Sequence, residues 1–119
     1  GLPAVLAGRF FVYGSHEKDN IPAEIAHPIL IDAGMAFGTG HHGTTKGCLV
    51  IFDKLLTEGF KPSAILDLGC GAGILAIAAA KALPDARIVA SDIDQDAVDV
   101  TLENARLNGA GEKMKVVQA

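Results

Sequence analysis

The chain has 119 residues, half of them apolar, and a formal net charge of −4. This length allows at most one small domain, and the apolar half is sufficient for a packed core. The sequence has no run of 18 or more apolar residues, no signal peptide pattern and no basic stripe. We therefore expect a cytoplasmic protein that binds neither membranes nor, directly, nucleic acid. Cys48 and Cys70 lack metal-ligand or redox spacing, as is usual in a reducing compartment.

The N-terminal part predicts two short strands and a long glycine-rich loop. Residues 9–13 and 29–31 are strand-like, and residues 14–28 between them are polar enough for a surface loop or linker. The glycine-rich loop follows at residues 32–45. From its end a helical pattern of apolar residues runs to Gly59, where we expect the helix to stop.

The second half of the chain predicts a regular series of strands and helices. In chain order the expected elements are a strand at about 64–68, a helix at 72–83, a strand at 87–91, a helix at 95–108 and a strand at 114–117. Strands that alternate with helices indicate an α/β protein with a parallel, doubly wound, Rossmann-like sheet. The first of these helices is apolar on nearly every side, so we expect it to lie buried against the sheet.

The segment Asp67-Leu68-Gly69-Cys70-Gly71-Ala72-Gly73 joins the first of these strands to its helix. A tight strand-to-helix turn leaves backbone N–H groups without helical partners, and glycines let a ligand approach that backbone closely. Asp92 stands nineteen residues beyond Gly73, at the end of the next strand. A strand–helix–strand unit delivers an acid at this distance to a pair of ribose hydroxyls. The pattern indicates a nucleoside-containing cofactor bound by Gly69, Gly71, Gly73 and Asp92.

Two features favour S-adenosyl-L-methionine over a dinucleotide. The dinucleotide fingerprint G-x-G-x-x-G would place its third glycine at position 74, which is Ile74 here. Asp67 stands at the mouth of the cleft, where it would repel a pyrophosphate but would suit a ligand with an ammonium and a sulfonium. We therefore include Asp67 among the cofactor-binding residues and interpret Asp94, which opens the next helix, as an N-cap.

A second motif, Phe37-Gly38-Thr39-Gly40-His41-His42-Gly43-Thr44-Thr45, precedes the first expected helix. Its glycines, hydroxyls and single aromatic are typical of a mobile loop that folds over the mouth of a cleft. The two histidines read as an exposed pair or capping groups, because no cysteine or carboxylate stands at metal-ligand spacing. The two threonines are candidates both for N-capping and for a ligand contact.

The strand count predicts an incomplete domain. Three strands of the parallel sheet are expected, all on one side of the strand at 64–68 if the connections are right-handed. Ligands in such sheets bind where the strand order reverses, between the first strand and a strand on its other side. Without that neighbour the 64–68 strand would be an apolar edge, which stable proteins avoid. We expect residues 1–31 to be preceding strands and a linker, and residues 32–119 to be a partial S-adenosylmethionine-binding domain that lacks the later strands.

Together these motifs make the chain resemble the ribosomal protein methyltransferases of the PrmA type, which are class I S-adenosylmethionine-dependent enzymes. The resemblance covers about residues 29–119, and its segments are 36–41, 44–45, 67–78, 92–94 and 103–109. It implies a mostly parallel seven-stranded sheet preceded by a separate substrate-recognition domain. The implied activity is N-methylation of lysine or α-amino groups of a ribosomal protein, protein eleven of the large subunit.

By the same resemblance, Thr45 contacts the cofactor from the loop above it and Gly69 lies against its methionine end. Asp92 holds the ribose hydroxyls, and Phe37 is a candidate to cover the cofactor or the target amine. No residue can be assigned as the base that takes the proton from the amine. The alternatives left open are a class I protein methyltransferase with another lysine or glutamine target, a dinucleotide-dependent oxidoreductase, and a non-catalytic binding module.

Overall fold

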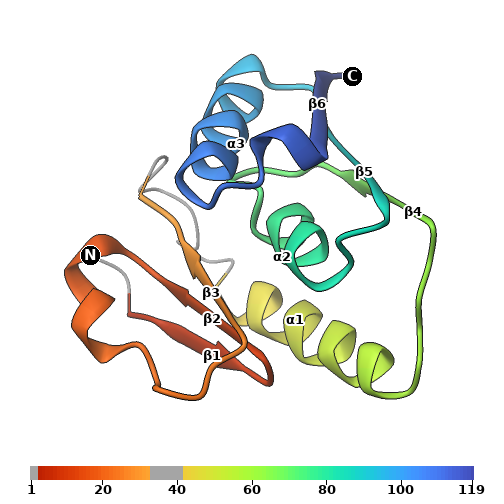
Figure 1. The fold of residues 1–119 in the computed structure, drawn as a ribbon. Coiled ribbons are helices and arrows are strands. Elements are labelled where there is room, and N and C mark those ends of the chain that lie inside the picture. Colours follow the sequence, from red (N-terminus) through yellow and green to blue (C-terminus); the bar gives the residue numbers. More distant parts are fainter. Residues whose placement is uncertain (1–2, 33–41) are drawn as a thin grey trace.

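The computed structural model describes residues 3–32 and 42–119, which form two three-stranded sheets and the helices that pack between and beside them (Figure 1). The strands are β1 (Val5–Ala7), β2 (Phe10–Tyr13), β3 (His27–Leu30), β4 (Ala64–Leu68), β5 (Arg87–Asp92) and β6 (Met114–Gln118). The α-helices are α1 (His42–Thr57), α2 (Ile74–Ala82) and α3 (Gln95–Leu107), and two short 3-10 helices cover Ser15–Asn20 and Gly111–Lys113. No helix in these two described ranges is long and apolar enough to cross a membrane.

The first sheet has the order β1-β2-β3, with β1 antiparallel and β3 parallel to β2. The sequence did not predict β1, because its three residues are too few to show the alternation that marks a strand. The segment 14–28, predicted as loop, contains a 3-10 helix and the start of β3 at His27. Pro28 lies within β3, which is tolerated because β3 is an edge of this sheet.

The second sheet has the order β4-β5-β6, and both of its strand pairs are parallel. This confirms the predicted α/β class and the expected position of β4 at an edge of the sheet, as far as the described residues go. Ile65 and Ile88, which pair across β4 and β5, point into the hydrophobic core. Their neighbours Leu66 and Leu68 point to the opposite face and are 59% and 74% exposed. The described helices therefore cover one face of this sheet, which is half of a doubly wound arrangement.

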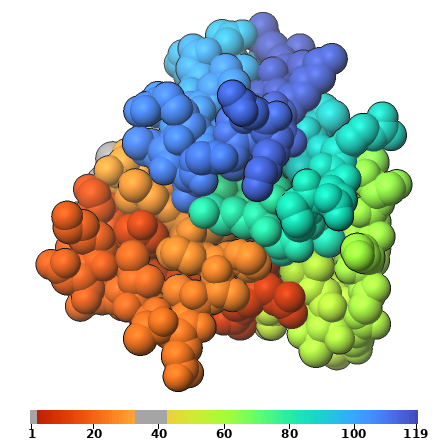
Figure 2. All heavy atoms as spheres, in the orientation of Figure 1, coloured from red at the N-terminus to blue at the C-terminus, as the bar shows by residue number. Residues whose placement is uncertain are grey.

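Helix α2 lies at the centre of the molecule, where it contacts β3, β4, β5 and α1 (Figure 1). Residues 76–80 of this helix, Ala-Ile-Ala-Ala-Ala, are each at most 2% exposed, as the all-round apolar pattern predicts. Side chains of both sheets belong to the same core cluster as this helix. Figure 2 shows the N-terminal strands, in red and orange, packed directly against the green middle of the chain.

The turn between β1 and β2 is attached to α1 by an ion pair. The Arg9 Nε donates to the Asp53 carboxylate at 2.6 Å, and the Arg9 backbone N–H donates to the same oxygen at 3.1 Å. Gly8, at φ +57°, leaves room for this carboxylate, since a Cβ at that position would lie 2.1 Å from Asp53 Oδ2. Burial of Asp53 opposes ionisation, but the hydrogen bonds from Arg9 outweigh it and hold the pKa of Asp53 below its usual range.

Replacing Asp53 with alanine is expected to lower the free energy of unfolding by about 1–2 kcal/mol at pH 7, since the Arg9 bonds are charge-assisted but partly exposed. Because the folded-state pKa is lowered, the effect is complete above the ordinary aspartate pKa. It disappears as the pH falls through the folded-state value. Urea unfolding from pH 3 to 7 measures it. Asp85→Ala, at an exposed turn, is the control, and an Asp53 effect that does not depend on pH would contradict the ion-pair explanation.

Candidate functional site

The glycine-rich loop runs from the end of β4 to the start of α2. Gly69, Gly71 and Gly73 all have positive φ values, of 68°, 56° and 89°, which side chains other than glycine adopt at a cost. The loop is fastened to β5 because the Cys70 N–H donates to the Ser91 carbonyl at 2.9 Å.

The three glycines differ in what surrounds them. A Cβ at Gly69 or Gly71 would meet no described atom within 4 Å, so the loop has an open surface there. A Cβ at Gly73 would lie 2.8 Å from the Thr101 methyl group, so packing against α3 also requires this glycine. The space above Gly69 and Gly71 is what close approach of a ligand to the backbone requires.

Asp92, the predicted ribose ligand, ends β5 directly beside the loop. Its Oδ2 accepts a hydrogen bond from the Gly71 N–H at 3.1 Å, and its Oδ1 accepts one from the Asp94 N–H at 3.0 Å. These backbone bonds, that from Asp94 first, lower the pKa of Asp92, so the group is a carboxylate at neutral pH. A carboxylate has about four acceptor positions, which leaves capacity for a pair of hydroxyl donors. The structure thus joins two of the predicted site residues, Gly71 and Asp92, by a direct bond.

Asp94 acts as the predicted N-cap of α3. Its backbone is extended, and its side chain accepts from the Asp96 N–H at 2.9 Å. The two neighbouring acids at the end of β5 therefore have different roles: Asp92 faces the loop and Asp94 starts the helix.

Asp67 lies near the end of β4, where the loop begins. Its Oδ2 is buried and has no hydrogen-bond partner among the described residues. Burial raises the pKa of this carboxyl, the Ala76 backbone N–H opposes the rise, and the nearby charge of Asp92 adds to it. A buried carboxylate oxygen without a partner is costly, and a cationic group at this point would offset that cost.

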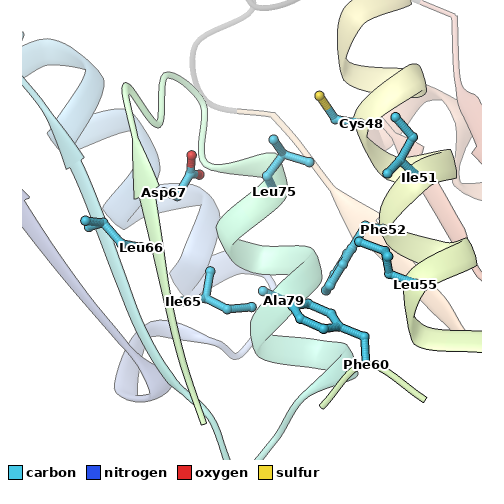
Figure 3. Close-up of a pocket in the computed structure, with 10 residues that line it drawn as sticks. All are labelled: Cys48, Ile51, Phe52, Leu55, Phe60, Ile65, Leu66, Asp67, Leu75 and Ala79. Carbon is cyan, nitrogen blue, oxygen red and sulfur yellow. The ribbon is translucent and has the colours of Figure 1, made fainter. Parts of the chain in front are cut away.

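An apolar groove of about 380 Å³ lies beside the loop, between α1, β4 and α2. Figure 3 shows Cys48, Leu75 and Asp67 at one end of it and Phe60 at the other. Thr45 is in the first turn of α1, one turn before Cys48. Phe37 lies outside the described residues.

Sequence reasoning gave no role to two polar residues of α3 and to the asparagine at its C-cap. Thr101 and Asn104 are completely buried and donate hydrogen bonds to the carbonyls of Gly71 and Ala72, at 2.8 and 2.9 Å. One turn later, Asn108 exchanges hydrogen bonds of 2.9 and 2.8 Å with the backbone N–H and carbonyl of Leu30 in β3. The available signal was their spacing of three and four residues, which puts them on one face of the helix.

The described residues at this site provide groups for binding a ligand. They provide two carboxylates, an open glycine backbone and an apolar groove, but no group of three or more potential metal ligands. Such a set can bind a ligand that combines a cation with a pair of hydroxyls.

Replacing Asp67 with asparagine is expected to raise the free energy of unfolding of the ligand-free protein at pH 7, on the order of 0.5–2 kcal/mol. The reason is that a neutral amide of the same size replaces a carboxylate whose ionisation is opposed by burial. Because the folded-state pKa is raised, the difference shrinks as the pH falls and the wild-type carboxyl becomes protonated. Urea unfolding across pH 4–8 measures it.

Replacing Asp92 with asparagine is the control, because the free energy of unfolding should change in the opposite direction. Asp92 has a lowered pKa, so Asp92→Asn should lower stability at neutral pH. An Asp67→Asn variant that is also less stable than the wild type at pH 7 would contradict the assignment of Asp67 as a strained carboxylate.

Known proteins match this chain over nearly its whole length. The family model for ribosomal protein L11 methyltransferase (PrmA) matches residues 2–119. The ribosomal protein L11 methyltransferase of Rhodopseudomonas palustris is 54% identical over 119 residues, and that of Bradyrhizobium diazoefficiens is 53% identical over 118 residues. The chain spans 39% of the length of each of these relatives.

A solved structure gives the same result. The ribosomal protein L11 methylase of Lactobacillus delbrueckii subsp. bulgaricus superposes with a TM-score of 0.76 at 28% sequence identity, over 98% of this chain and 56% of that one. The fold is therefore that of a class I methyltransferase, as the sequence predicted, and the resemblance of the motifs is confirmed. The chain belongs to the ribosomal protein L11 methyltransferase (PrmA) family.

Proposed function

We propose that this chain is the cofactor-binding part of an S-adenosylmethionine-dependent protein N-methyltransferase. The observation that carries the proposal is the glycine loop held between two carboxylates, Asp67 at the end of β4 and Asp92 at the end of β5. Parallel α/β sheets bind their ligands at this edge, where the carboxyl ends of the strands meet.

The site residues fit S-adenosylmethionine group by group. Asp67 has a buried oxygen without a partner among the described residues, which could take the ammonium group, and Asp92 has spare acceptor capacity for the ribose hydroxyls. Gly69 and Gly71 leave open space along the loop, and Gly73 lets the loop approach α3. Thr45 and Phe37 complete the proposed set, both by family resemblance. When bound, this cofactor supplies a methyl group activated on a sulfonium.

A dinucleotide fits the same loop less well. Its pyrophosphate needs backbone N–H donors at the helix N-terminus. Here the Gly71 N–H already donates to the Asp92 carboxylate, and two acidic side chains border the loop. An oxidoreductase therefore remains the weaker alternative.

The substrate proposed from the family is ribosomal protein L11, methylated on lysine or α-amino groups; another lysine or a glutamine is the alternative target. For a neutral amine, alignment with the methyl group and exclusion of water can supply on the order of 7–11 kcal/mol of the barrier reduction. The partner is thus a protein, in the cytoplasm, and direct contact with nucleic acid or membrane is not part of the proposal.

We further propose that residues 32–119 are one part of the cofactor-binding domain, and that residues 1–31 are the strands and linker that precede it. The exposed edge of β4 and the exposed side chains of Leu66 and Leu68 support the proposal that the domain is only partly present. In a class I sheet such surfaces are covered by further strands and helices.

The test of the cofactor is calorimetric titration of the full-length protein with S-adenosylhomocysteine, with NADH as the comparison. Saturable binding of adenosylhomocysteine alone is expected. Asp92→Ala should weaken that binding by about 1–3 kcal/mol, since it leaves hydroxyl donors unpaired. Binding of NADH in place of adenosylhomocysteine would overturn the methyltransferase proposal.

Asp94→Ala is the matched control for Asp92. It removes the N-cap of α3 and should lower stability by about 1 kcal/mol, but leave the affinity unchanged. Equal losses of affinity in the two variants would show that Asp92 acts through the fold and not through the ligand.

Gly71→Ala tests the open backbone of the loop. The added methyl group meets no described protein atom, so the cost to the fold is the strain of positive φ, roughly 1–2 kcal/mol, while bound adenosylhomocysteine would be displaced. Gly109→Ala is the control, because it has a similar φ of +67° and equally open space beyond the end of α3. Similar losses in thermal stability are expected, with weakened binding in the Gly71 variant alone. Normal binding by Gly71→Ala would contradict the loop assignment.

A further inference from the structure

The buried polar residues of α3 hold the glycine loop from the side opposite its open surface. Thr101 and Asn104 are each 0% exposed, and each donates to a carbonyl of the loop. Burial of hydroxyl and amide groups is costly unless their hydrogen bonds are made, so these bonds fix the position of the loop relative to α3.

Thr101 has the larger share of these contacts. Its hydroxyl donates to the Gly71 carbonyl at 2.8 Å and lies 3.3 Å from the Cys70 sulfur. A hydroxyl has one proton, so when it donates to the carbonyl the Cys70 thiol must be the donor to the hydroxyl. Burial raises the pKa of the Cys70 thiol, which keeps that proton in place. A chain of hydrogen bonds therefore runs from Cys70 through Thr101 to Gly71.

Gly71 is thereby held on both sides. Its N–H donates to Asp92 in β5, and its carbonyl accepts from Thr101 in α3. The next carbonyl, that of Ala72, accepts from Asn104. Together these bonds set the orientation of successive peptide groups at the place where the loop has its open surface.

We propose that Thr101 and Asn104 are positioning residues for the cofactor site, holding the carbonyls of Gly71 and Ala72 toward α3 so that the loop presents its open side to the ligand. This inference rests on the proposed function. The rival explanation is that these hydrogen bonds only stabilise the folded core, with no effect on the affinity of the site for its ligand.

The test is calorimetric binding of adenosylhomocysteine to variants of the full-length protein, at a temperature well below all of their unfolding midpoints. Thr101→Val keeps the shape but removes the hydroxyl, and we expect the affinity to fall about tenfold. Thr101→Ser retains the donor and should restore the affinity. Asn104→Leu should weaken binding in the same way as Thr101→Val.

Asn108→Leu is the matched control. It removes a half-buried amide at the C-cap of the same helix, one turn after Asn104. The three hydrogen bonds of this amide join Leu30 and Asn104 and not the loop. It should lower the melting temperature yet leave the affinity unchanged. Wild-type affinity in Thr101→Val and Asn104→Leu, or an equal loss in Asn108→Leu, would overturn the proposal.

Amide hydrogen exchange separates this inference from the proposed function. If the wild-type protein does not bind adenosylhomocysteine, the proposed function fails, but the loop can still be examined directly. Faster exchange at the Gly71 and Gly73 amides in Thr101→Val than in Asn108→Leu would support the positioning role. Equal exchange rates in the two variants would refute it.

Discussion

The structure depends on the burial of α2. A helix that is apolar on every side has no face to present to water, so each side must be covered by another element. In this chain β3, β4, β5 and α1 supply the cover, and the two sheets consequently share one core. Each large aliphatic side chain buried in this way, such as Ile77, contributes about 1.5–3 kcal/mol. The glycine loop leads directly into α2, so the most deeply buried helix also fixes where the loop emerges at the edge of the sheet.

The two carboxylates beside the loop have opposite environments. Asp92 accepts two backbone hydrogen bonds, which favour its charge. Asp67 is buried, and one of its oxygens has no partner in the described part of the chain, which opposes its charge. The first arrangement stabilises the folded chain without a ligand. The buried Asp67 carboxylate lowers the stability of the ligand-free chain, and a bound cation would offset that loss. Such a cost is common at residues that serve binding. The site therefore contains one acid that organises the loop and one whose charge, under the proposed function, the ammonium group of the ligand would balance.

The sequence predicted those parts of the fold that depend on pattern. The β4–α2–β5 unit, the N-cap at Asp94 and the edge position of β4 follow from periodicity, capping chemistry and connection rules, and the structure confirms them. It did not predict β1, which is too short for periodicity and is held by pairing with β2 and by burial of Val5 and Ala7 in the core. The cofactor residues were proposed from spacing within a strand–helix–strand unit. Their mutual bonds were not predictable, because bonds such as that between Gly71 and Asp92 depend on loop conformation.

The difference between α2 and α3 explains why one half of the site could be predicted and the other could not. Burial of apolar area has no direction, so the packing of α2 can place the loop but cannot orient its peptide groups. Hydrogen bonds are directional, and Thr101 and Asn104 aim theirs at consecutive carbonyls. In a helical pattern these two residues merely interrupt an apolar stripe, which by periodicity weakens the case for a buried face. The role of Thr101 and Asn104 can be recognised only when the position of the loop is known. A polar side chain on a buried face is tolerated only if its hydrogen-bond partners lie within reach.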